Sequence, residues 1–419
     1  MSTALQPSAN PDVLVIGAGA AGIAATRALI EAGVCVTLIE VRDRVGGRAF
    51  TNTQACEWPI DMGAGWLHSA DRNPLVRVAN AEGFEIDRSA PPWQKPMLDK
   101  RFPVAEQKRF RAAQAAFYER VESAAREPAD QPAVLLLEDD NRWNAMIDAV
   151  STYVNGTELD RLSVKDFDNY HDTEVNYRIE RGYGSLFERL ARPLPIVLGC
   201  RATAIDHSGK TLRVETSRGT MTARAVIVAV PTNLIASEAI RFSPQLPDKH
   251  NAAAHLPLGH DNKLFLALDV ADEFAPDSRL WGARDTVATG SYHLRPFGRP
   301  LIEAYFGGRL ARDLEKHGLE GFGHFAIEQL ASVLGSGVRK RLKPLAVSSW
   351  SSDPFAGGAY SHALPGHWDK RALLAAPVEN RLFFAGEACS PHDFSTVHGA
   401  WQTGLAAAED ARRALAAPV

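Results

Sequence analysis

A glycine-rich loop between an apolar run and a helical pattern constrains the fold of this chain more than any other feature. Residues 13–16 (VLVI) read as a short buried strand that ends in Gly17-Ala18-Gly19-Ala20-Ala21-Gly22. A helical pattern follows as far as Gly33, and a second apolar run over 34–39 ends at Glu40. Strand, glycine loop, helix and strand in this order predict a parallel βαβ unit with a right-handed crossover.

The loop suits a ligand that carries a pyrophosphate. Gly17 permits the tight turn, Gly19 lets the backbone approach the pyrophosphate, and Gly22 lets the helix pack closely on the strand. The start of the helix, which includes Ala21, presents free N–H groups and a partial positive charge. Glu40 is placed to accept hydrogen bonds from ribose hydroxyls. The unit predicts a dinucleotide site in preference to an empty tight turn, and it leaves NAD and FAD both open.

Composition sets broad limits. With 419 residues the chain is long enough for two domains, and its net charge of -4 gives no general attraction to nucleic acid or anionic membranes. The N-terminus lacks a signal-peptide pattern, and no run reaches the ~18 apolar residues of a membrane span. Four scattered cysteines suit a reducing compartment, and Cys35, in an apolar strand pattern, is expected to be buried. We therefore expect a cytoplasmic protein.

The rest of the chain alternates between helical and extended patterns. Helices are expected over 105–126, 141–150, 158–165, from Gly182 onward, near 321–333 and through 404–414. Strands are expected over 195–198, 212–216, 221–223, 225–230, 263–268 and 381–385. This order indicates a cofactor domain assembled from three separated segments and a substrate domain built from two insertions.

A second motif begins directly after the βαβ unit. Residues 40–48 have the pattern E-x-R-x-R-x-G-G-R, and here the chain resembles the flavin-containing amine oxidases, which include the monoamine and polyamine oxidases. The resemblance implies FAD as the cofactor, with Arg42, Gly47 and Arg48 among its contacts. Gly47 lets a second turn of backbone come close, and Arg48 can neutralise pyrophosphate charge rather than lie in solvent.

The resemblance extends over the whole chain and implies an α/β fold. Its FAD-binding domain would be Rossmann-like, of the glutathione-reductase type, and discontinuous, with segments 11–75, 184–250 and 376–419. Residues 76–183 and 251–375 would form an α+β substrate domain in which helices flank a mixed sheet. The pattern is nearest to that of the polyamine oxidases.

Two segments resemble the surroundings of the isoalloxazine in this family. In residues 61–68 the resemblance implies that Gly63, Ala64, Gly65 and Trp66 line the flavin and that His68 faces the substrate; a structural histidine is the alternative. Lys263 stands where the family has a lysine that a water bridges to flavin N5, although a lysine in a strand commonly points into solvent. A cation there would favour the charge of the reduced flavin and assist its reaction with oxygen.

Further matches lie at the adenine and in the C-terminal third. The strand from residue 201 to 205 resembles the one whose backbone meets the adenine near Ala202. Trp350 would lie against the flavin, and Tyr360 would form one wall of an aromatic slot for the amine; both are alternatively core aromatics. The closing signature contains Gly386, Glu387, Thr396 and Val397: Glu387 would meet the ribityl or phosphate region, and Val397 would offer its N–H to the pyrimidine edge.

Two positions depart from the monoamine oxidase pattern. Ala359 stands where those enzymes carry the cysteine that is joined to the flavin, so the FAD is predicted to be non-covalent. Thr396 replaces the second aromatic of the slot, which implies a wider or more polar pocket and favours longer, polycationic substrates.

These observations predict an FAD-dependent oxidase of polyamines or related amines. A hydride would pass from the amine α-carbon to flavin N5, the imine would hydrolyse, and O2 would reoxidise the flavin to give H2O2. Lys263, Tyr360, His68 and Thr396 are the expected substrate-side residues, and acidic residues within 166–174 are either ligands for distal ammonium groups or solvated. The expected partners are a small amine and O2, with no nucleic acid, membrane or metal, since no metal-ligand spacing is present.

Three other functions stay open. An L-amino-acid oxidase would need an arginine for the substrate carboxylate, and Arg295 and Arg299 lie in the expected substrate domain. Desaturases and protoporphyrinogen oxidases share the glycine loop and the closing signature. A flavin-bound scaffold without turnover is the third. The particular amine, the bond that is cleaved, the electron acceptor and the oligomeric state are not encoded in these motifs.

Overall fold

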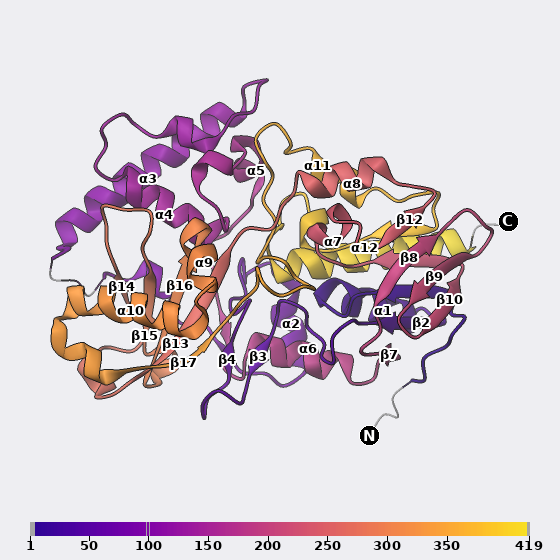
Figure 1. The fold of residues 1–419 in the computed structure, drawn as a ribbon, viewed down its shortest axis with the longest axis horizontal. Coiled ribbons are helices and arrows are strands. Elements are labelled where there is room, and N and C mark those ends of the chain that lie inside the picture. Colours follow the sequence, from indigo (N-terminus) through magenta and orange to yellow (C-terminus); the bar gives the residue numbers. More distant parts are fainter. Residues whose placement is uncertain (1–4, 98, 100, 417–419) are drawn as a thin grey trace.

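The structure is a computed structural model that describes residues 5–97, 99 and 101–416. Two five-stranded sheets lie in opposite halves of an elongated molecule (Figure 1). The first has the order β18-β11-β1-β2-β7, and all its pairings are parallel. In that order its strands are Leu382–Phe384, Ala225–Val228, Val13–Ile16, Val36–Ile39 and Ile196–Val197. The predicted βαβ unit is therefore confirmed, with β1 at the centre of the sheet.

Strand β2 begins two residues later than its apolar pattern suggested. Cys35 lies just before Val36 and is exposed, so the expectation of a buried thiol is wrong. The residues of the turn after α1 carry the chain over the surface before it enters the sheet. Apolar character alone could not place this boundary.

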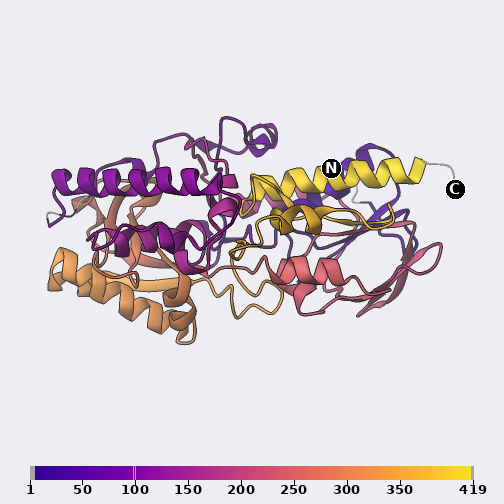
Figure 2. The ribbon, with the colours of Figure 1, turned by 90° about the horizontal axis from the view of Figure 1, so that it is seen from above.

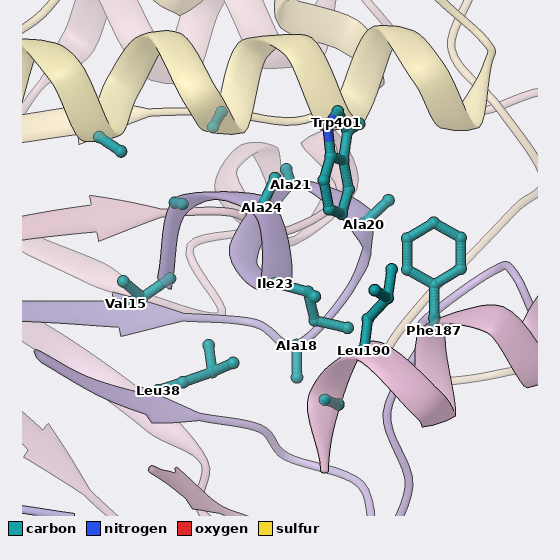
Figure 3. Packing of buried hydrophobic residues seen from close by; sticks show 14 of the residues in the cluster. Val15, Ala18, Ala20, Ala21, Ile23, Ala24, Leu38, Phe187, Leu190 and Trp401 are labelled. Atoms are coloured by element: carbon teal, nitrogen blue, oxygen red, sulfur yellow. The ribbon is translucent and has the colours of Figure 1, made fainter. Parts of the chain in front are cut away.

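One face of the parallel sheet is covered by two helices from the two ends of the chain. Helix α1 (Ala20–Glu31) packs along α12 (Val397–Ala416), and a Cβ at Gly404 would lie 2.1 Å from the Ala21 carbonyl oxygen. Figure 3 shows Trp401 of α12 beside the start of α1, with Phe187 of α6 (Tyr183–Ala191) in the same buried cluster. This packing brings the closing segment of the chain onto the glycine loop.

The opposite face of the parallel sheet packs on a small four-stranded sheet. Because side chains alternate along a strand, Val13 and Val15 join the helical layer, whereas Leu14 and Ile16 join the other core. The small sheet has the order β10-β9-β8-β12, with strands Gly219–Ala223, Leu212–Thr216, Ala202–Asp206 and Arg241–Ser243. Three short helices border this layer: α7 (Thr232–Ala236), α8 (Pro247–Ala254) and α11 (Lys370–Ala375).

The second five-stranded sheet has the order β14-β15-β16-β13-β17. Its strands are Ser278–Trp281, Ser291–Leu294, Leu301–Gly307, Asp261–Leu268 and Leu342–Val347. The expected mixed sheet is antiparallel at each of its four pairings, because short connections join β14 to β15 and β15 to β16. Its apolar face packs on helices α9 (Gly308–Glu315) and α10 (Gly318–Leu334).

Helices α3 (Val104–Ala125) and α4 (Asn144–Val154) lie on the other side of this sheet, and the long α3 is prominent in the view from above (Figure 2). The helix expected over 158–165 is wrong: a short 3-10 turn comes first, and Ser163 then caps α5 (Val164–Asn169). The remaining elements are α2 (Pro74–Ala81), β3 (Thr51–Asn52), β4 (Ile60–Asp61), β5 (Ile86–Asp87) and β6 (Arg178–Ile179). None of the helices in the described ranges is long and apolar enough to cross a membrane.

Candidate active site between the two sheets

A cavity of about 860 Å³ runs from the glycine loop to the antiparallel sheet. Every residue that the sequence assigned to the site lines this cavity, except Gly22. Those lining residues are Gly17, Gly19, Ala21, Glu40, Arg42, Gly47, Arg48, Gly63, Ala64, Gly65, Trp66, His68, Ala202, Lys263, Trp350, Tyr360, Gly386, Glu387, Thr396 and Val397. The fold thus collects residues from both ends and the middle of the chain around one space.

The glycine loop has the geometry that its sequence predicts. Gly17 has a φ of 102°, and a Cβ there would lie 2.5 Å from the Ala229 carbonyl oxygen. Gly22 lies beneath the loop, where a Cβ would meet the Gly17 carbonyl oxygen at 1.8 Å. A Cβ at Gly19 would meet nothing within 4 Å, so this glycine borders open space at the start of α1. An anionic group can approach the backbone there.

A second glycine turn lies beside the first. The Gly46 N–H donates to the Ala18 carbonyl at 2.8 Å, and Gly47 has a φ of 58°. Glu40 is buried, and its carboxylate accepts hydrogen bonds from the Ala18 N–H at 2.7 Å and the Arg42 N–H at 2.9 Å. Glu40 therefore connects the two loops, in addition to lining the cavity.

The two arginines of the E-x-R-x-R-x-G-G-R motif that line the cavity have carboxylate partners. Arg42 donates to Asp353 at 2.8 Å, and Arg48 donates to Glu387 at 2.9 Å. Burial raises the pKa of Glu387, but Arg48 and the hydrogen bond from Ser361 more than offset this, so the pKa lies below its ordinary value. Glu387 is therefore ionised at neutral pH and ties the closing signature to Arg48.

The closing signature brings a second helix N-terminus to the cavity. Helix α12 begins at Val397, and its first N–H groups have no partners within the helix. The Thr396 hydroxyl donates to the Asp393 carbonyl at 2.6 Å and accepts the Gly399 N–H at 2.9 Å. Its hydroxyl is thus occupied in capping α12, while the residue still borders the cavity. Gly386, with a φ of 145°, also faces open space.

Residues 63–65 run through a narrow gap between two side chains. A Cβ at Gly63 would lie 2.0 Å from the Arg48 carbonyl oxygen and 2.9 Å from the Trp350 ring. On the other side, a Cβ at Gly65 would lie 3.0 Å from Lys263 Nζ. The Trp350 indole N–H donates to the Met62 carbonyl at 3.1 Å, which fixes the ring in place. Glycine is required here because backbone and side chains approach so closely.

Strand alternation places Lys263 on the cavity face of β13. Lys263 and Asp261 point to this face, whereas Leu264 joins the apolar core on the other. Lys263 Nζ lies 2.9 Å from Glu303 Oε1, and both side chains are buried. The contact is an ion pair, and in the described residues the other Nζ hydrogens have no protein acceptor.

Glu303 is the centre of a buried charge cluster that sequence reasoning missed. Arg178 donates to its other oxygen at 2.9 Å, and His293 Nδ1 lies 3.7 Å from it. Burial raises the pKa of Glu303, but Arg178 and Lys263 outweigh it and hold the pKa well below its ordinary value. The available signal was a charged residue within the apolar run 301–307. This signal could be used only if the run was first identified as a strand.

His68 borders the cavity as a neutral imidazole. Burial lowers its pKa, against the opposing influence of Asp172. Its Nδ1 lies 2.6 Å from the Asn176 side-chain oxygen, which can only accept. Nδ1 therefore carries the hydrogen, and Nε2 is an acceptor.

Tyr360 is held by its hydroxyl, which donates to the Tyr153 carbonyl at 2.6 Å. Burial and the nearby Asp261 carboxyl raise its pKa well above the ordinary value, so it is a neutral phenol. Its ring can form a wall of the cavity. Trp66 lies further along this wall and makes an edge contact with Trp93 at a centroid distance of 4.5 Å.

The two arginines weighed for a substrate carboxylate do not line the cavity. Arg295 donates to the Phe274 carbonyl at 2.8 Å, and Arg299 donates to the Glu180 carbonyl at 2.9 Å. Within the acidic segment 166–174, Asp166 pairs with buried Arg371 at 2.7 Å, whereas Asp172 and Glu174 line the cavity. Asp166 is thus structural, Asp168 does not line the cavity, and Asp172 and Glu174 can meet a ligand.

The residues present fit a flavin nucleotide. Two helix N-termini and two open glycine positions, Gly19 and Gly386, face the same space, which suits a pyrophosphate and a polar ring edge. Trp350 and the 63–65 segment border the middle of the cavity, and Lys263 lies at the boundary with the antiparallel sheet.

Comparison with known proteins agrees with this geometry. Residues 20–174 and 141–412 match the family described as flavin containing amine oxidoreductase. Polyamine oxidase 5 of Oryza sativa subsp. japonica is 32% identical over 98% of this chain and 89% of its own length. Polyamine oxidase 2 of Arabidopsis thaliana is 31% identical over 96% of this chain and 88% of its own length.

The fold is also similar to that of solved structures. A putrescine oxidase with redesigned cofactor binding superposes with a TM-score of 0.80 at 19% identity, over 96% of this chain and 99% of the other. This likeness confirms the expected α/β fold. On the family match, the near-full-length relatives and the geometry of the cavity, the chain belongs to the flavin-containing amine oxidoreductases and is a flavin-dependent amine oxidase.

Proposed function

We propose that the protein binds FAD without a covalent bond and oxidises an extended amine, of the polyamine kind or related to it. The observation that carries this proposal is the position of Lys263. It lies against Gly65, where the part of the cavity that we assign to the flavin meets the antiparallel sheet. Ala359, whose carbonyl accepts from Arg48 at 2.7 Å, has no nucleophile to join to a flavin.

When bound, the flavin would supply the acceptor for a hydride from the amine α-carbon and would pass the electrons to O2, which would yield H2O2. The protein orients the substrate and excludes water. His68 Nε2 can accept a hydrogen bond from the amine, and the Tyr360 ring can form one side of its slot. Lys263 keeps donors free beside the reacting centre, because its ammonium has three N–H groups and, in the described residues, only Glu303 lies within ion-pair distance.

The names of the relatives support an extended amine as the substrate, since they are polyamine oxidases and the structural neighbour is a putrescine oxidase. The cavity itself continues well past Lys263 to Trp281 and Tyr118 on the far side. Asp172 and Glu174 at its wall can accept hydrogen bonds from ammonium groups. Such a space suits a chain longer than a simple monoamine.

An anaerobic titration tests the proposed reaction. Spermine, spermidine, acetylated polyamines, putrescine, monoamines and L-amino acids are added in turn while the oxidised flavin band is followed. Bleaching by extended amines, followed by peroxide release when air is admitted, is the expected result. Absence of bleaching by every amine would favour a scaffold without turnover, and bleaching by L-amino acids alone would favour the amino-acid oxidase alternative.

Acid precipitation tests the attachment of the cofactor. The flavin is expected to stay in the supernatant, with the mass of FAD, while the pelleted protein is colourless. A yellow pellet would show a covalent bond and contradict the inference from Ala359.

The domain boundaries and the location in the cell are proposals of the same kind. We infer that segments 11–75, 184–250 and 376–419 form the cofactor domain, and that 76–183 and 251–375 form the substrate domain. Limited proteolysis is expected to cut near these junctions. Fractionation of the source cells is expected to place the protein in the cytoplasm, and recovery in a membrane or secreted fraction would contradict this.

A further inference from the structure

Arg279 is a cavity arginine without a carboxylate partner. It lies on the edge strand β14, directly opposite His293, and its side chain shares the cavity face with Glu303 and Lys263. Its Nε donates to the Ser291 hydroxyl at 3.2 Å, and its Cζ lies 5.2 Å from the centre of the Trp281 ring. Among residues 5–97, 99 and 101–416, no carboxylate lies within ion-pair distance of it, and its two terminal nitrogens make no hydrogen bond.

Arg178, a buried arginine on this side of the sheet, provides a comparison with the half-buried Arg279. Arg178 is balanced by Glu303, and the attraction of this carboxylate outweighs burial, so the pKa of Arg178 is raised. Burial lowers the pKa of Arg279 to about 10, and only the hydroxyls of Tyr153 and Tyr305 oppose this. An isolated charge in a low-dielectric site is costly unless a partner neutralises it. The described residues supply no negative counter-charge for Arg279, so a ligand can supply it.

A protonated carboxyl group lies on the same face of the sheet. Asp261 lines the cavity two residues before Lys263, and its Oδ1 is buried without a hydrogen-bond partner in the described residues. Burial raises the pKa of Asp261 to about 8, against the lowering influence of Lys263. The nearby Tyr360 hydroxyl donates to the Tyr153 carbonyl. Asp261 is therefore protonated at neutral pH, and its O–H can donate a hydrogen bond to the nitrogen of a neutral amine.

These two groups are separated along the sheet. Arg279 leans toward Ser291 on β15, and the order β15-β16-β13 puts two strand spacings between Ser291 and the strand of Asp261. Ser291 is in register with Lys263 through Tyr305, and Asp261 lies two residues further along β13. At about 4.8 Å per strand spacing and about 3.4 Å per residue, the separation is roughly 12 Å. A ligand that meets both groups needs its carboxylate and its amine at opposite ends of a chain.

In the described residues, no side chain of the neighbouring helices pairs with Arg279. Lys95 and Arg111 line the same cavity, as do Asp172 and Glu174. A distal ammonium group near Arg279 would meet like charge, whereas a carboxylate would meet a planar fork of donors that matches its two oxygens.

From these contacts we propose that the substrate is an amine that carries a carboxylate remote from its reacting nitrogen, with the carboxylate bound by Arg279 and the reacting nitrogen, in its neutral form, placed near Asp261. This inference rests on the proposed amine oxidase function and narrows its substrate. An α-amino acid does not satisfy it, because a single carbon separates its amine from its carboxylate. A chain such as an ω-amino acid, or a polyamine extended by a carboxyalkyl group, does.

The test uses flavin-loaded enzyme and amines of equal chain length that differ only at the far end. The ends are a carboxylate, an ammonium, an acetamide and a methyl group, and an α-amino acid is included. The carboxylated amine is expected to have a kcat/KM at least ten times that of the diamine. Equal values for the two, or a preference for the diamine, would overturn the proposal. A preference for the acetamide would also overturn it, because it would show that Arg279 binds a neutral carbonyl group and not a carboxylate.

Two substitutions identify the residue responsible. Arg279→Gln is expected to lower kcat/KM for the carboxylated amine by about 10–100-fold, since a charge-assisted hydrogen bond is lost, and to leave the methyl-ended amine within about twofold. Arg279→Glu is expected to reverse the order and favour the diamine, a gain that a misfolded variant cannot produce. Arg213→Gln, on an exposed part of β9, is the matched control and is expected to change neither value.

The outcomes separate this proposal from the one on which it rests. Bleaching of the flavin by amines without any influence of the carboxylate would leave the amine oxidase function intact and remove only the role of Arg279. Equal losses on all substrates in Arg279→Gln would show a structural role. Absence of bleaching by every amine would contradict both proposals.

Discussion

Lys263 and Glu303 lie on neighbouring antiparallel strands, and their nearest charged atoms are 2.9 Å apart. Lys263 directly faces Tyr305 across the strand pair, so Glu303 is its diagonal neighbour on the cavity face. Arg178, from a short strand 125 residues earlier in the chain, holds the second oxygen of Glu303. The lysine is thus fixed by a carboxylate that is itself fixed by an arginine, beside the backbone of Gly65.

Replacing the lysine tests its place in the reaction. Lys263→Met is expected to slow flavin reduction or its reoxidation by about 100-fold, since an oriented cation beside developing charge is removed. The flavin content should stay unchanged, because Lys263 belongs to the substrate end of the cavity. Stopped-flow absorbance measures both half-reactions, with Lys343→Met on the exposed part of β17 as the control. Unchanged rates in Lys263→Met would remove this residue from the site.

Replacing the carboxylate tests the charge cluster. Glu303→Gln leaves Arg178 and Lys263 buried without a counter-charge and is expected to destabilise the fold by about 3–5 kcal/mol. Glu303→Asp keeps the charge and should recover part of the loss. Thermal unfolding of the flavin-loaded protein measures the change.

Glu328→Gln is the matched control for this change. Glu328 pairs with Arg339 at 2.7 Å on the surface, where loss of an ion pair costs only about 0–1 kcal/mol. A loss in Glu303→Gln no larger than that in Glu328→Gln would contradict the importance of the cluster.

The glycine loop offers two substitutions with opposite expectations. A Cβ at Gly22 would lie 1.8 Å from the Gly17 carbonyl oxygen, so Gly22→Ala should disturb the fold of the loop itself. A Cβ at Gly19 would meet no protein atom within 4 Å, so Gly19→Ala should fold normally and bind flavin at least about tenfold more weakly, a loss of about 1.4 kcal/mol. Fluorescence titration of the apoprotein with FAD measures this.

Gly337→Ala serves as the control for the glycine loop. Gly337 is also free of neighbours within 4 Å, but it lies on the surface, away from the cavity. Its affinity for FAD should equal that of the parent protein. If Gly19→Ala behaves in the same way, the open space at Gly19 is not the pyrophosphate site.

The raised pKa of Asp261 predicts a pH-dependent stability. The folded protein holds a proton on this carboxyl up to about pH 8, whereas the ordinary value is 3.8, so the folded state binds more protons between these limits. Stability therefore falls as the pH rises from about 4 to 8 and is level above. Asp261→Asn removes this loss. The free energy of unfolding of Asp261→Asn relative to that of the parent should therefore be higher at pH 8 than at pH 4, by at most about 6 kcal/mol at 1.36 kcal/mol per pKa unit.

Urea unfolding midpoints across this pH range provide the measurement. Asp206→Asn is the control, because its hydrogen bonds with Ser208 lower rather than raise the pKa of this exposed carboxyl. A stability difference for Asp261→Asn that does not grow with pH would show that Asp261 is ionised in the folded protein.

The flavin end of the site could be predicted from sequence to a large extent. The turn at Gly17, the open position at Gly19 and the close packing at Gly22 depend on backbone geometry within a few residues, and such requirements leave a readable pattern. The same holds for Gly46 and Gly47, whereas the helical pattern indicated the last helix over 404–414 and α12 begins at Val397. The start of β2, and with it the exposure of Cys35, could not be predicted from the sequence, because it depended on where the preceding turn ended.

The substrate end required the tertiary structure. Asp261, Arg279 and Glu303 lie on three strands, and their meeting on one face depends on strand register and on which face α9 and α10 bury. The sequence does not distinguish Arg279 from Arg295 and Arg299, yet of these three only Arg279 lines the cavity. The sequence by itself determined a dinucleotide site, because its loop contacts are local, and the resemblance of its motifs added the flavin. Only the tertiary structure decided which charges face the substrate, because pairing between distant strands determines which buried charges are neutralised and which are left for a ligand.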